Sequence, residues 1–176
     1  YVATWLTWWQ GDMLGDLVAA PFLLTWVSAP WYRTTNARAV EAAVLGAALL
    51  GTSLLLLGGD STNPSGLAAF QQPTTLLPLL IWATLRFGTP GASAATILVS
   101  SVAVWTTALG RGPFIRPELH QSLAVLQGFM SVVAVTFLVL GAVIGERQRV
   151  ERERTELFHR ERLARAYADE MRQRYG

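Results

Sequence analysis

Two aspartates stand inside an otherwise apolar stretch near the start of the chain. Asp12 and Asp16 are four residues apart, so on a helix they share one face. Inside a membrane an unpaired carboxylate costs about 2.5–3.5 kcal/mol, unless it is protonated, paired or faces water. The two side chains are therefore candidates for binding a cation, carrying a proton or holding a polar ligand. The alternative is a structural hydrogen bond to a neighbouring helix, and under either interpretation we expect both to face the helix bundle.

Aromatic and basic side chains supply the other candidates for sensing. Trp8 and Trp9 precede the aspartates and fit an aromatic belt at a membrane surface, where anchoring alone accounts for them. Arg111 stands between Gly110 and Gly112, a pattern that can present backbone N–H groups beside a guanidinium to an anion. The simpler interpretation, which we favour, is a loop arginine that faces lipid phosphates.

Residue types that would indicate catalysis or a cofactor are missing from the sequence. Cys is absent, and the two histidines, His120 and His159, are far apart in the chain. The sequence holds no nucleophile triad, phosphate loop or metal-ligand spacing. We therefore predict no catalytic residue, no cofactor, no metal and, because no basic patch lies outside the C-terminal tail, no nucleic-acid partner.

Composition separates the chain into an apolar body and a charged tail. Of the 176 residues, 52% are hydrophobic and 15% are charged. Residues 1–145 hold five Arg and five acids, whereas residues 146–176 hold nine Arg and seven acids. The body has too few polar residues to cover a soluble domain and too many apolar ones to be disordered. The class predicted is all-α: a polytopic transmembrane helix bundle over residues 1–145, followed by a long cytoplasmic helix.

Apolar stretches of about 17–25 residues predict membrane spans. The chain has five such stretches, of which the third is short and which end at polar or Gly/Pro breaks; they cover residues 3–27, 39–57, 76–87, 92–109 and 122–145. One orientation places twelve of the fourteen Arg on the side of the tail, as the positive-inside rule prefers. We therefore expect a cytoplasmic C-terminus, an outer Tyr1 with further helices before it, and Arg86 as an inner-face anchor.

The charged tail carries a repeat of seven residues. The repeat consists of Val143, Val150, Leu157, Ala164 and Met171. It forms one half of a coiled-coil seam, whereas Arg and Glu occupy much of the other half. We predict a marginal parallel coiled coil in a homodimer, with a solvated charged helix as the alternative. Gly141 and Gly145, just before the tail, form a small-residue pair that could lie on the dimer axis.

Four ordered blocks of the sequence resemble the MASE1 family of membrane-associated sensor domains. The blocks are WLTWWQGDMLGDLVAAPFLL at residues 5–24, LPLLIWATLRFG at 77–88, VW and GRGPF between 104 and 114, and VIGER at 143–147. The resemblance implies the later part of a helical input domain that is fused to histidine kinases, diguanylate cyclases and related output modules.

The tail shows a weaker similarity to the phosphoacceptor helix of one histidine-kinase class. It lies in residues 160–169, but Ala168 stands where the phosphorylated histidine would be. We therefore favour a plain linker helix over a degenerate phosphoacceptor segment.

The residues and the resemblance together predict the sensory input region of a bacterial receptor, with a sensor histidine kinase favoured. A cyclase input domain and a transporter or channel subunit remain alternatives. The expected partners are membrane lipid, a second copy of the chain, a small-molecule or membrane-protein signal, and a downstream kinase or cyclase domain.

Overall fold

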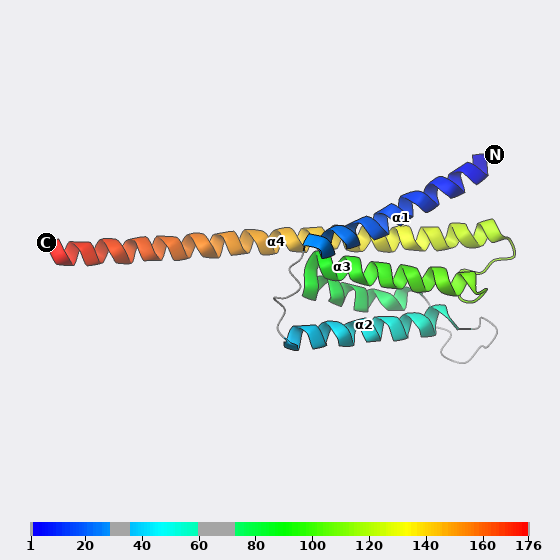
Figure 1. The fold of residues 1–176 in the computed structure, drawn as a ribbon, viewed down its shortest axis with the longest axis horizontal. Helices are drawn as coiled ribbons and strands as arrows, with labels where there is room; N and C mark the ends of the chain where they lie inside the picture. Colours follow the sequence, from blue (N-terminus) through cyan, green and yellow to red (C-terminus); the bar gives the residue numbers. More distant parts are fainter. Residues whose placement is uncertain (1, 29–35, 60–72, 176) are drawn as a thin grey trace.

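The computed structural model describes residues 2–28, 36–59 and 73–175, and within these ranges the chain is helical, apart from residues 58–59 and 109–118, and contains no strand. Figure 1 shows the helices α1 (Val2–Ser28), α2 (Asn36–Leu57), α3 (Leu77–Ala108), which follows the short 3₁₀ helix Pro73–Leu76, and α4 (Leu119–Tyr175). The all-α prediction is confirmed. Residues 29–35, between the first and second predicted spans, and residues 60–72, between the second and third, lie outside the described residues.

Among the described residues, three helical segments are long and apolar enough to cross a membrane, judged by length and composition. They are Asn36–Leu57, Pro73–Ala108 and Leu119–Arg162. The sequence predicts five spans instead of three. The count differs because α1, which carries both aspartates, is not among the three, and because the third and fourth predicted spans are counted together as α3.

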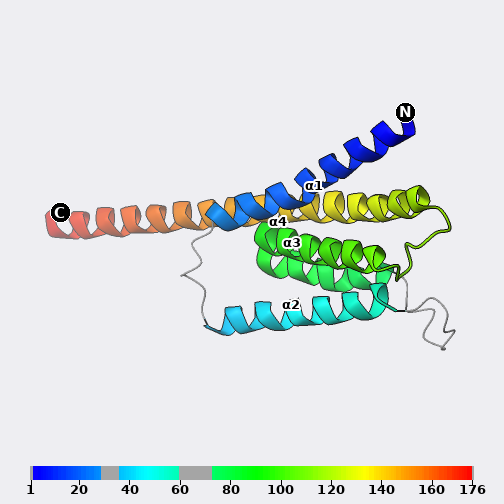
Figure 2. The same ribbon diagram turned by 45° about the vertical axis from the view of Figure 1, so that its right-hand side comes forward.

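That joined helix, α3, reverses its direction at Gly88. Gly88 has φ +66° and ψ −146°, a conformation outside the helical region and on the side of positive φ that favours glycine. A Cβ atom at Gly91 would collide with the carbonyl oxygen of Ala83, although eight residues of straight helix span about 12 Å. The segments 77–87 and 89–108 therefore lie side by side as antiparallel arms of a hairpin, as Figures 1 and 2 show.

The second arm of α3 lies at the centre of the bundle, since α3 packs against α1, α2 and α4. Its buried side chains are mostly small, with Ala92, Val99 and Ala103 fully enclosed. Small side chains let neighbouring helices approach closely, which is a main source of packing energy where lipid removes the hydrophobic driving force. Leu49 of α2 and Phe137 of α4 complete the core from either side.

Helix α4 is one uninterrupted helix of 57 residues, about 85 Å long at 1.5 Å per residue. Its first part packs on the bundle, and the remainder extends well beyond it (Figure 1). Residues 146–175 contain neither Gly nor Pro, so nothing in the sequence interrupts the helix after it leaves the bundle.

Candidate functional site at the junction of α3 and α4

The two aspartates of α1 point away from the bundle, so the prediction that they face it is wrong. Leu14 and Val18 form the packed face of α1 and are only 3% and 7% exposed. Asp12 and Asp16 each lie two residues from a packed residue, about 200° around the helix, and both are exposed. Periodicity shows that the two acids share a face, but the neighbours α3 and α4 decide which face of α1 is buried.

The tryptophans near the start of α1 also lie on its outer surface. Trp8 and Trp9 are both exposed, and the ring of Trp9 stacks on that of Trp5 with centroids 6.3 Å apart. Among the described residues, no enclosed pocket brings these rings and the two carboxylates together. An exposed aromatic group at one end of a helix agrees with membrane anchoring.

The turn around Arg111 does not offer the anion site that its sequence allows. The backbone N–H of Gly110 donates to the carbonyl oxygen of Thr107, and the N–H of Arg111 donates to that of Thr106, each over 3.0 Å. Both groups therefore cap the end of α3. Gly110, the first residue after this capped end, has positive φ, as is common for a glycine that ends a helix. The Arg111 residue itself is exposed.

Arg86, the predicted inner-face anchor, joins two helices. Its Nε donates to Oε1 of Glu41 over 2.5 Å, and one terminal nitrogen donates to Oε2 over 2.7 Å. This bidentate pair links the first arm of α3 to the beginning of α2. Sequence reasoning missed Glu41 as the partner, because the two residues are 45 positions apart and no local spacing relates them.

The reversal of α3 lies directly against α4. The Thr89 hydroxyl donates to the carbonyl oxygen of Gly141 over 3.1 Å. A Cβ atom at Gly141 would stand 3.0 Å from Cβ of Ala92, and one at Gly145 would stand 3.2 Å from the Thr89 hydroxyl. The Gly141 and Gly145 pair therefore receives α3 of the same chain, which corrects the expectation that it lies on a dimer axis. Two glycines four residues apart predict close helix packing, but they do not predict which helix packs against them.

The apolar repeat of the tail is exposed on α4. Val143, Val150 and Leu157 are 49%, 42% and 64% exposed, and the side chains of Ala164 and Met171 lie outside the described part of the chain. Val132 and Val139, also exposed, fall on the same side, within about 40° of Val143 on a straight helix. These exposed apolar residues of α4, from Val132 to Leu157, form one stripe along the helix. The stripe begins inside the bundle, whereas the repeat predicted from the sequence begins at Val143. The coiled coil itself stays a prediction.

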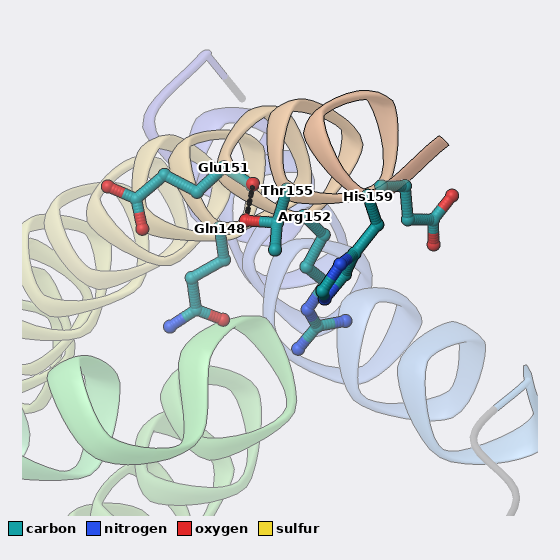
Figure 3. Close-up of a pocket in the computed structure, with 6 residues that line it drawn as sticks. Gln148, Glu151, Arg152, Thr155 and His159 are labelled. Carbon is teal, nitrogen blue, oxygen red and sulfur yellow. Dashed lines mark hydrogen bonds between the residues drawn. The ribbon is translucent and has the colours of Figure 1, made fainter. Parts of the chain in front are cut away.

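A shallow hollow on the tail, shown in Figure 3, is the surface of one helix. Its lining comes wholly from α4 and consists of Gln148, Glu151, Arg152, Thr155, Glu156 and His159. The Thr155 hydroxyl donates within the helix to the carbonyl oxygen of Glu151 over 2.9 Å. The hollow has no second wall among the described residues, and these also contain no group of three His, Cys, Asp or Glu residues that could hold a metal.

A helical bundle with several apolar helices and one long helix leaving it is the architecture of a membrane-associated protein. The family model of MASE1 matches residues 1–148, so the chain belongs to the MASE1 family, a membrane-associated sensory domain found in signalling proteins. No curated protein and no solved structure matches the chain. The match contains the reversal of α3 and both glycines of the α4 junction.

Proposed function

We propose that residues 1–148 receive a signal in the bacterial inner membrane and that α4 conveys it to a cytoplasmic output domain. The observation that supports this most is the continuity of α4. The family match ends at residue 148, yet the same helix runs from Leu119 inside the bundle to Tyr175. A rigid helix that is common to the bundle and the tail can carry a displacement from one to the other.

The proposed topology has five crossings and a cytoplasmic tail. It counts α1, α2, the two arms of α3 and the first part of α4 as crossings. Its support is the arginine distribution, with twelve on the tail side and two, Arg111 and Arg116, on the other. The antiparallel arms of α3 fit this alternation, because they return the chain to the outer side before α4 begins.

The proposed receptor is a homodimer, and its output domain is a histidine kinase. The dimer rests on the exposed stripe of α4, since Val150 and Leu157 stand in the charged, water-facing part of the helix. The choice of a kinase over a cyclase rests on the similarity of residues 160–169 to a phosphoacceptor segment. With Ala168 at the place of the histidine, these residues act as a linker, and the chemistry belongs to the output domain.

Insertions into the tail test whether α4 conveys the signal. In the full-length receptor, two residues inserted between Arg152 and Glu153 rotate the following helix by about 200°, whereas seven residues rotate it by only about 20°. Basal output should change strongly with two residues and stay near the original level with seven, although seven lengthen the helix more. Equal output from both insertions, with equal amounts of protein in the membrane, would contradict conduction through α4.

A further inference from the structure

We propose that Thr89, seated between Gly141 and Gly145, is a pivot that fixes the position of α4 along its own axis, so that α4 signals by tilting and not by sliding. This inference rests on the proposed function, because it specifies how α4 moves when it conveys a signal. It concerns the inner end of the α3 hairpin, where the bundle last touches the helix that leaves it.

The contact is close and involves the backbone on both sides. A Cβ atom at Gly141 would lie 3.0 Å from Cβ of Ala92 and 3.3 Å from Cα of Thr89. The Thr89 hydroxyl also donates to the carbonyl oxygen of Gly141 over 3.1 Å. Because these atoms belong to the main chain or lie next to it, rotation of a side chain cannot relieve crowding at this point.

Sliding by one helical turn is blocked in both directions. Four residues of α4 cover about 6 Å, so a shift of one turn replaces each contact residue by the one four positions away. A shift toward the C-terminus would bring the large, buried side chain of Phe137 to the place of Gly141, against Ala92. A shift the other way would bring Arg149 to the place of Gly145, against Thr89.

The α3 turn is itself held in place, as a pivot requires. Gly88 closes the reversal with positive φ, and Gly91 brings the second arm against the backbone of the first. The Arg86–Glu41 ion pair then ties the first arm to α2. Thr89 is thus presented to α4 by a turn that is connected to a third helix.

Tilting of α4 about Thr89 remains possible, and it displaces the far end of the tail more than any other part of the helix. Beyond Gly145 the α4 side chains that the structure describes are exposed, up to Arg162 and at Arg165. The tail extends about 45 Å past the pivot, so a tilt of about 5° displaces its far end by about 4 Å. Such a tilt leaves the contact at the pivot in place, whereas a slide by one turn shifts it by about 5.4 Å and is the more drastic transition.

Disulfide formation within the chain tests whether the axial position is fixed. The protein has no cysteine, so each pair can be introduced alone. In the full-length receptor in membranes, Thr89→Cys should crosslink efficiently with Gly145→Cys, because the two side chains would be in contact. Thr89→Cys with Arg149→Cys, one turn further on the same side, should crosslink several-fold less. The control Thr89→Cys with Ala142→Cys should not crosslink, since Ala142 is exposed on another side of α4.

Equal crosslinking from Thr89→Cys to the cysteines at positions 145 and 149 would overturn the pivot, because α4 would then occupy both axial positions. The failure of the proposed function is distinguishable from this result. If the two insertions into the tail leave output equal while crosslinking stays confined to position 145, the contact is only a packing contact and α4 does not signal. If the insertions differ in output but positions 145 and 149 crosslink alike, the pivot alone is wrong.

A pair of compensating substitutions tests whether the contact sets the output. Gly141→Ala places a methyl group against Ala92 and should change basal output several-fold. Adding Ala92→Gly removes the opposing Cβ atom, the nearest of the crowded atoms, and should move output back toward the original level, while the approach to Cα of Thr89 remains. The matched control is Gly128→Ala on the same helix, where a Cβ atom meets nothing within 4 Å and output should not change. Equal output from Gly141→Ala and Gly128→Ala, at equal abundance in the membrane, would overturn the pivot.

Discussion

Among the helix glycines with an ordinary helical backbone, Gly91→Ala should be the most destabilising substitution, because its Cβ atom would make the shortest contacts. The new Cβ atom would overlap the carbonyl oxygen of Ala83 and Cβ of Phe87, both fixed by the first arm of α3. Overpacking of this kind costs about 1–3 kcal/mol, because the arms must separate. Gly46→Ala is the control: its Cβ atom meets nothing within 4 Å, and alanine favours a helix by about 1 kcal/mol over glycine. The propensity gain is common to both substitutions, so the two variants should differ by the overpacking cost, about 1–3 kcal/mol in free energy of unfolding.

The difference can be measured by unfolding the purified protein in mixed micelles with increasing SDS. Tryptophan fluorescence reports the tertiary structure, since the chain has seven tryptophans. The midpoint of Gly91→Ala should fall below that of the unmodified protein, and the midpoint of Gly46→Ala should equal or exceed it. If both variants unfold at the same SDS fraction, the arms of α3 do not make the close contact that defines the hairpin.

Three further predictions concern the topology, the dimer and the ion pair. Glu118→Cys should react with a membrane-impermeant maleimide from outside intact cells and Thr155→Cys only after permeabilisation, and the reverse would invert the proposed topology. Leu157→Cys should form a disulfide between two copies in membranes far better than Thr155→Cys, which lies on another face of α4, and similar yields would exclude the parallel stripe. Glu41→Gln should weaken the link between α2 and Arg86, since the Glu41 carboxylate accepts two hydrogen bonds from that arginine. Amide hydrogen exchange in the first turns of α2 should therefore increase relative to the control Glu118→Gln. Unchanged exchange there would show that the ion pair does not hold the beginning of α2 in place.

Local properties of the sequence determined the class of protein and the division of the chain. Apolar stretches, breaks at Gly and Pro and the concentration of charge after residue 145 predict membrane helices followed by an exposed helix, because hydropathy and charge act residue by residue. The boundary expected between the third and fourth spans coincides with the reversal at Gly88 for the same reason. The family also follows from sequence, since its blocks are contiguous and ordered.

Tertiary packing decided which face of each helix has which neighbour. Periodicity places Asp12 and Asp16 together, but only the packing of Leu14 and Val18 shows that the acids point outward. The pair Gly141 and Gly145 is suited to close contact with any helix, and the hairpin of α3, not a second copy, occupies it. A helical pattern specifies angles around one axis, whereas contacts depend on how several axes are arranged, and that arrangement comes from residues far apart in the chain.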